Sequence, residues 1–128
     1  MTGRAQARPG IGRARLSRSA DFDRVFRRGR SHASRELVLY VFPREDDGGT
    51  RLGLSVSRKV GGAVQRNRVK RLLREAFAQE SAGLPAGMDA VIVARQEAWN
   101  LADRAGLAGI QTALAELIAQ ARDGSAAR

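Results

Sequence analysis

Residues 51–77, with the sequence RLGLSVSRKVGGAVQRNRVKRLLREAF, contain the pattern that decides the fold. Over 51–57 large apolar residues alternate with glycine and serine, which predicts a strand with one apolar face and one small, polar face. The pair Gly61 and Gly62 then interrupts the chain. Apolar residues recur at helical spacing after this break, so the sequence predicts a strand followed by a helix over 63–79.

This predicted helix has an apolar side and a strongly basic side. Arg66, Lys70 and Arg74 lie at i, i+4 and i+8, so one side of the helix carries them in a row. The 17 residues from 58 to 74 include seven basic residues and no acidic one. A solvated helix face or a localisation signal is the alternative explanation. A face that only keeps a helix soluble normally mixes both signs of charge, so the pattern favours binding to the phosphates of a nucleic acid.

Strands are predicted on both sides of this unit. Residues 36–42, ELVLYVF, are rich in β-branched and aromatic side chains and predict a strand, for which 51–57 is the expected return strand after a polar turn over 44–50. Residues 89–95, DAVIVAR, are apolar almost throughout, which is typical of a strand that is buried on both faces. The segment 51–95 is therefore a predicted strand–helix–strand unit.

Two further helices complete the predicted domain. The first begins with Ser19 as its N-cap and ends before Gly29 as its C′ residue. The last is capped by Asn100 and has a stripe of leucine and isoleucine. The order of elements predicts an α/β (α+β) fold, a small two-layer sandwich in which helices cover a mixed sheet.

The sequence divides into one domain and two tails. Residues 1–17 are rich in arginine, glycine and alanine and predict a disordered basic arm. Residues 18–122 form the predicted domain, and residues 123–128 a frayed C-terminus.

Composition excludes several classes of site. The chain has 128 residues, a formal net charge of +10, no cysteine and a single histidine, His32, which lies in a predicted polar turn. Disulfides, thiolate metal sites, a cysteine nucleophile and histidine-based metal sites and triads are therefore excluded. No nucleotide-binding or hydrolase motif is present either, so we expect no catalytic residue and no metal ligand in the polypeptide. Without a membrane-spanning run or a signal peptide, a cytoplasmic protein is expected.

Three aromatic residues have two explanations each. Phe22 and Phe26 fit a first helix that packs on the sheet, and their residue type favours a core position. The competing hypothesis is that one of them stacks on an unpaired base in a groove. Tyr40 is ambiguous in the same way, because its ring is apolar and its hydroxyl group is polar.

The sequence resembles a known family in three segments. Residues 51–77 resemble the signature of the bacterial ribonuclease P protein subunit, within which Arg66-Asn67-Arg68 is the most specific part. Residues 15–30, RLSRSADFDRVFRRGR, are similar to the first-helix pattern of that family, in which two aromatic residues flank a valine. Residues 89–95 resemble its last strand. The similarity covers roughly residues 13–120 in the same order and spacing.

The resemblance implies a function that composition alone does not indicate. Family members are the small basic protein of a ribonucleoprotein whose RNA is catalytic, and the holoenzyme removes the 5′ leader of precursor tRNA by hydrolysing a phosphodiester bond. The implied partners are the catalytic RNA and precursor tRNA, without a membrane or a small-molecule substrate. The implied cofactor is Mg²⁺, held mainly by the RNA. The implied fold has a left-handed strand–helix–strand crossover, contrary to the usual right-handed rule.

The same resemblance implies two sets of contact residues. The catalytic RNA would contact Arg58, Lys59, Arg66, Asn67, Arg68, Lys70, Arg71 and Arg74. A cleft between the first helix and the sheet would hold the single-stranded leader, lined by Phe22, Phe26, Tyr40, Ser55 and Ser57. The chain departs from the family at Gly62, where many members have asparagine, and at Ser57, where some have lysine.

Charge alone also allows other nucleic-acid binders. A non-catalytic RNA-binding protein of ribosomal or chaperone type is the main alternative, and dependence on one specific RNA separates it from the ribonuclease P subunit. A duplex DNA binder that places the basic helix in the major groove is disfavoured, because the sequence has no evident dimerisation stripe or second reading element.

Overall fold

The computed structural model describes residues 15–16, 19–44 and 48–127, with the backbone alone at 124–127. The elements follow one another as α1 (Ser19–Arg28), β1 (Arg30–Ala33), β2 (Leu37–Pro43), β3 (Arg51–Val56), α2 (Ala63–Glu80), the 3₁₀ turn η2 (Ser81–Gly83), β4 (Met88–Ala94) and α3 (Ala98–Ala127). None of the described helices is long and apolar enough to cross a membrane.

The four strands form one mixed sheet in the order β1-β2-β4-β3. β4 pairs antiparallel with β2, where Ile92 is opposite Leu39, and parallel with β3, where Ile92 is level with Leu54. The predicted hairpin between 36–42 and 51–57 is therefore wrong, because β4 is inserted between these two strands. An apolar strand such as β4 is more stable in the interior of a sheet, where both of its faces are covered.

β4 confirms the prediction of burial on both faces. Its central residues Ala90, Val91 and Ile92 are fully buried. Ile92 belongs to the main core, whereas Val91 packs in a second cluster with Val25 and Leu16. Successive side chains of a strand point to opposite faces, so this one strand contributes to two cores.

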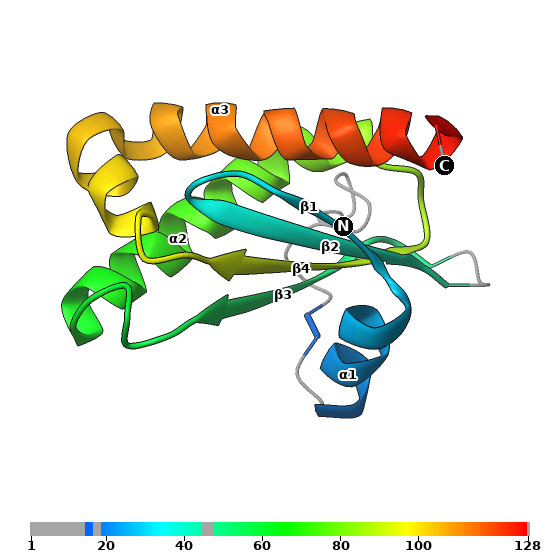
Figure 1. Ribbon diagram of the computed structural model, residues 1–128, viewed down its shortest axis with the longest axis horizontal. Coiled ribbons are helices and arrows are strands. Elements are labelled where there is room, and N and C mark those ends of the chain that lie inside the picture. Colours follow the sequence, from blue (N-terminus) through cyan, green and yellow to red (C-terminus); the bar gives the residue numbers. More distant parts are fainter. Residues whose placement is uncertain (1–14, 17–18, 45–47, 128) are drawn as a thin grey trace, which may run out of the picture.

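Helices lie on both faces of the sheet (Figure 1). α2 and α3 pack against each other and cover one face, where they enclose the main core. α1 lies on the other face, and its Val25 is fully buried there. The predicted small sandwich of a mixed sheet and covering helices is confirmed, and α1 adds a partial layer on the second face.

Gly29 follows the last residue of α1, as the sequence predicts. It does not adopt the left-handed conformation that is common at this position; the described glycines with positive φ are Gly61, Gly87 and Gly106. A Cβ atom at Gly29 would instead collide with the carbonyl oxygens of Val25 and Val41, so close backbone approach explains the glycine. His32, predicted in a turn, lies in the edge strand β1.

α3 begins earlier and is less regular than the sequence predicts. Its first helical residue is Ala98, so Asn100 lies inside the first turn and is not the cap. Gly106, with φ 59° and ψ −148°, interrupts the helix, and Figure 1 shows a short segment before this kink and a long one after it. The helical backbone continues to Ala127, beyond the predicted end of the domain at residue 122.

Part of the predicted N-terminal arm packs on the domain. Arg15 pairs with Leu52 in an isolated parallel bridge, and the N–H of Leu16 donates to the carbonyl oxygen of Leu52 at 3.1 Å. Leu16 is buried beside Val25. Arg15 and Leu16 therefore belong to the folded domain and not to a disordered arm. The rest of that arm and the acidic residues 45–47 of the predicted turn lie outside the described residues.

Candidate nucleic-acid interface

The basic side of α2 is exposed, as its periodicity predicts. We call Arg66, Asn67, Arg68, Lys70, Arg71 and Arg74 the α2 basic face. Four of these side chains are exposed, and those of Arg66 and Lys70 are half-buried. The opposite side of the helix, including Val69, Leu73 and Phe77, is buried in the main core. The apolar side thus fixes the direction in which the cations point.

No carboxylate of the described part of the chain forms an ion pair with a cation of the α2 basic face. Arg66 donates from Nε to the carbonyl oxygen of Gly61 at 3.2 Å, which fixes that side chain at the start of the helix. Like charges at i, i+4 destabilise a helix slightly. An unneutralised row of cations therefore favours an anionic partner that relieves this repulsion.

The loop before α2 carries two more of the predicted RNA-binding residues. Arg58 and Lys59 are exposed, and the neighbouring Val60 is anchored in the main core. The N–H of Lys59 donates to the hydroxyl oxygen of Ser57 at 3.3 Å. In Figure 1 this loop joins the end of β3 to the start of α2, so both cations lie close to the first turn of the α2 basic face.

Gly62 is the N-cap of α2, with an extended conformation at φ −73° and ψ −179°. Its N–H donates to Oε1 of Gln65 at 2.8 Å, which provides half of a capping box. A Cβ atom at Gly62 would meet nothing within 4 Å, so the asparagine of related sequences would fit here. The glycine removes a possible cap without changing the shape of the turn.

Three predicted leader-binding residues lie together on the sheet face that carries α1. We call Phe22, Phe26 and Tyr40 the aromatic cluster. The ring centroids of Phe26 and Tyr40 are 4.9 Å apart at 80°, and those of Phe22 and Phe26 are 6.2 Å apart at 45°. Phe26 is 40% exposed, whereas the other two rings are half-buried. An exposed ring beside two fixed rings can stack on an unpaired base.

The two serines of the predicted groove differ in position. Ser55 lies on β3 level with Val93, on the same sheet face as Tyr40, and is half-buried. Ser57 follows the end of β3 and is exposed. A Cβ atom at Gly53 would lie 2.8 Å from the ring of Phe22, so Phe22 covers this part of the small, polar face that the sequence predicts to be open.

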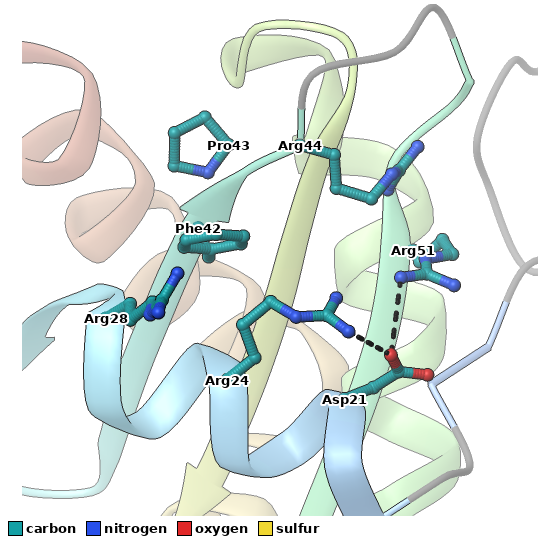
Figure 2. Close-up of a pocket in the computed structure, with 7 residues that line it drawn as sticks. All are labelled: Asp21, Arg24, Arg28, Phe42, Pro43, Arg44 and Arg51. Carbon is teal, nitrogen blue, oxygen red and sulfur yellow. Dashed lines mark hydrogen bonds and ion pairs between the residues drawn. The ribbon is translucent and has the colours of Figure 1, made fainter.

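A network of ion pairs that the sequence did not predict lies under α1. Asp89 of β4 is fully buried, and its carboxylate accepts hydrogen bonds from two arginines. Arg44 donates to Oδ1 at 2.6 Å, and Arg51 donates to Oδ1 and to Oδ2 at 2.8 Å each. Asp21 pairs with Arg24 at 3.1 Å and lies 3.9 Å from Arg51. In Figure 2 the side chains of Arg24 and Arg51 both reach toward Asp21. The sequence did contain one indication of this network, because Asp89 is a carboxylate at the start of an otherwise apolar strand. A charge that is buried in this way needs partners of opposite charge.

The protonation states of this network follow from burial and hydrogen bonding. Burial is the largest single influence on Asp89 and by itself raises the pKa of the carboxyl group. The hydrogen bonds from Arg51 and Arg44 outweigh it together, so the pKa of Asp89 lies below its ordinary value. The hydrogen bond to Asp89 in turn raises the pKa of Arg51. Asp89 and Arg51 are therefore both charged at neutral pH.

The described residues offer no metal centre. No three carboxylate or histidine side chains among residues 15–16, 19–44 and 48–127 are grouped so that they could hold a metal ion. These residues therefore offer no cluster of carboxylates that could hold Mg²⁺ without further ligands from water or an RNA.

The profile of the Ribonuclease P family matches residues 12–121 of this sequence. The chain belongs to the ribonuclease P protein family. It is 49% identical over 81 residues to the ribonuclease P protein component of Brevibacillus brevis, and this match covers 63% of this chain and 64% of that protein. It is also 49% identical over 87 residues to that of Halalkalibacterium halodurans, covering 68% and 73%. The chain thus spans slightly less than two thirds of the first relative.

Solved ribonuclease P proteins have the same fold. The Staphylococcus aureus RNase P protein superposes with a TM-score of 0.76 at 33% identity, over 87% of this chain and 97% of that one. The Thermotoga maritima RNase P protein gives 0.73 at 31% identity, over 83% and 96%. The resemblance inferred from residues 51–77 is confirmed. The roles of individual residues in the α2 basic face and the aromatic cluster stay predictions.

Proposed function

We propose that this chain is the protein subunit of ribonuclease P and supports removal of the 5′ leader from precursor tRNA. In this proposal the catalytic RNA binds to Arg58, Lys59 and the α2 basic face, and the single-stranded leader binds to the aromatic cluster. The observation that supports it most is the row of cations on α2, which is unneutralised by any described carboxylate, in a chain of this family.

The protein acts in this proposal by binding and positioning. In this proposal the RNA carries the chemistry and holds most of the Mg²⁺, as the family resemblance implies. When bound there, the ion supplies a Lewis acid for phosphodiester hydrolysis. The cations of α2 lower the repulsion between two RNA strands that approach each other, so less free Mg²⁺ is needed to bring them together. The aromatic cluster fixes the leader on one side of the cleavage site.

Family membership favours this function over the alternative of a general RNA-binding protein of ribosomal or chaperone type. That alternative rested on charge alone, and charge is shared by both classes of protein. The cytoplasmic location stays a prediction.

The proposal is tested by cleavage of precursor tRNA with the cognate catalytic RNA at low Mg²⁺ concentration. We expect the protein to restore cleavage at the mature 5′ end and to have no activity without the RNA. Protein that binds the RNA but never restores cleavage at any protein concentration would favour the general RNA-binding alternative.

We predict that Phe26→Ala weakens binding of precursor tRNA more than binding of mature tRNA. The ring is exposed beside Tyr40, and stacking of one base on an aromatic ring contributes about 1–3 kcal/mol, or roughly 5- to 150-fold in affinity. Dissociation constants of the two tRNAs for the reconstituted holoenzyme measure the difference.

Phe22→Ala is the matched comparison. The Phe22 ring lies over Gly53 and packs with the buried second cluster, so its loss should lower the stability of the fold. Circular dichroism and urea unfolding of both variants separate the two effects. Equal losses of precursor and mature tRNA binding in a folded Phe26→Ala variant would show that this ring does not contact the leader.

A further inference from the structure

A large apolar side chain is exposed at the start of α2. Val64 is 82% exposed and belongs to neither of the two core clusters. Among the described residues, the other large apolar side chain that is exposed is Phe26, at 40%. Single exposed apolar side chains are common on protein surfaces, so the surroundings of Val64 decide what it can do.

Val64 lies on the outward side of α2, among the cations. It is the second residue of the helix, and at 100° per residue Arg68 and Arg71 lie within about 40° of it around the helix axis, one and two turns further along. Both arginines are exposed, and neither forms an ion pair with a described carboxylate. The loop that carries Arg58 and Lys59 leads into the same turn (Figure 1). Val64 is therefore an apolar side chain within a cationic surface.

The fold itself does not require a valine at this position. The start of the helix is fixed by Gly62, whose N–H donates to Oε1 of Gln65 at 2.8 Å, and Val64 takes no part in that contact. Valine has a lower helix propensity than alanine, because its branched side chain is restricted in a helix. Its apolar surface is stabilising only where a partner removes it from water. The valine therefore favours an apolar contact with the partner that binds the α2 basic face.

An RNA offers one kind of surface to an apolar side chain. Its phosphates and ribose hydroxyl groups are polar, and the faces of paired bases are covered by stacking on their neighbours. The major groove of an A-form helix is too deep and narrow for side chains to read. Unpaired bases in loops, bulges and ends have open faces that pack against protein side chains. An unstacked base is therefore the part of an RNA that fits Val64.

We propose that Val64 packs against an unstacked base of the catalytic RNA, while Arg68 and Arg71 bind phosphates beside it. This inference rests on the proposed function and adds to it a contact that distinguishes one RNA from another. Phosphate contacts carry no sequence information directly, whereas a base contact requires an unpaired nucleotide at the correct place. Val64 is thus a specificity-determining residue beside the α2 basic face.

The test uses Val64→Ala, which removes two methyl groups and leaves every charge in place. We expect the affinity for the catalytic RNA to fall roughly tenfold, as for the loss of two buried methyl groups. The slope of log affinity against log salt should stay unchanged, because no phosphate contact is lost. Filter binding over a range of salt concentrations measures both quantities. Because alanine has the higher helix propensity, urea unfolding should show a fold at least as stable as that of wild type.

Arg68→Ala and a fully paired RNA duplex are the matched comparisons. Arg68→Ala should weaken binding of both the catalytic RNA and the duplex and lower the salt slope by up to about 0.9, since a phosphate contact does not depend on the base. Val64→Ala should leave the affinity for the duplex unchanged, because the bases within a duplex are stacked.

The outcomes separate this inference from the proposed function. If wild-type protein restores cleavage but Val64→Ala binds the catalytic RNA as tightly as wild type, the base contact is wrong and the subunit function stands. An equal loss of affinity for the catalytic RNA and the duplex, or a lowered salt slope in Val64→Ala, also overturns the base contact, because the substitution then acts on phosphate binding.

If wild-type protein restores no cleavage, the proposed function fails, and an RNA hairpin with an unpaired loop takes the place of the catalytic RNA in the comparison. A loss of affinity in Val64→Ala for this hairpin, but not for the duplex, supports the base contact. Equal affinities of wild type and Val64→Ala for the hairpin overturn it.

Discussion

Asp89→Asn is expected to lower the free energy of unfolding by about 3 kcal/mol, at the lower end of the range for breaking a buried ion pair. The side chain is fully buried and joins Arg44 to Arg51. The substitution replaces the carboxylate that both guanidinium groups bind under α1 with a neutral amide. We expect the lower end of this range because the side chains of Arg44 and Arg51 are 11% and 29% exposed. Water can therefore hydrate them in part once the carboxylate is lost. Urea unfolding at neutral pH measures the change.

Asp103→Asn is the matched control for this variant. Asp103 is exposed on α3, so the same chemical change there should shift the free energy of unfolding by less than about 0.5 kcal/mol. Equal effects of the two substitutions would mean that net charge, and not the buried network, determines the result.

The effect of Asp89→Asn depends on pH with a definite sign. The pKa of Asp89 is lower in the folded protein than the ordinary value of 3.8 that applies to the unfolded chain. A carboxylate with a lowered pKa stabilises the fold fully above the unfolded value, and this stability is lost as pH falls through the folded value. The difference between wild type and Asp89→Asn should therefore be constant near neutral pH and shrink only in acid below pH 3.8. A difference that shrinks already between pH 7 and pH 5 would contradict this assignment.

The double substitution Arg68→Ala with Arg71→Ala is expected to weaken binding of the catalytic RNA on the order of 100-fold, if each side chain contacts one phosphate. Each lost contact to a helical backbone should also lower the slope of log affinity against log salt by up to about 0.9. Both side chains are exposed on the α2 basic face, so the fold should be retained. Filter binding over a range of salt concentrations measures both quantities.

Arg122→Ala controls for the loss of net charge. Arg122 is exposed near the end of α3, which Figure 1 places at the opposite end of the molecule from the start of α2. Its loss should change affinity and slope only slightly. Unchanged salt dependence in the double variant would exclude direct phosphate contacts by Arg68 and Arg71. A slope lowered equally by Arg122→Ala would point to a general charge effect.

Local patterns in the sequence determined more of the α2 region than of any other part. The side chains of one helix face are a few residues apart, so the division of α2 into a buried and a basic side follows from helical periodicity alone. The burial of β4 on both faces also follows from its own residues. The specific pattern around Arg66-Asn67-Arg68 indicated the family, which the comparisons confirm.

Contacts between distant residues decided what those patterns could not. A strand has two edges, and its own residues do not specify which other strand occupies each edge. Residues 36–42 and 51–57 therefore resembled a hairpin, whereas β4 lies between β2 and β3 in the structure. The polar strand β1 forms because the edge of β2 can hydrogen-bond to it, which its side chains do not indicate.

The candidate site shows the same division. Sequence singled out Phe22 and Phe26 as a pair, but only the packing of α1 over Gly53 distinguishes the covered ring from the exposed one. The network of ion pairs under α1 was not predicted, because Arg24 and Arg51 come from separate elements and meet only where the sheet register places them around Asp89. Periodicity reports neighbours along one element, whereas a buried charge network depends on the packing of several elements.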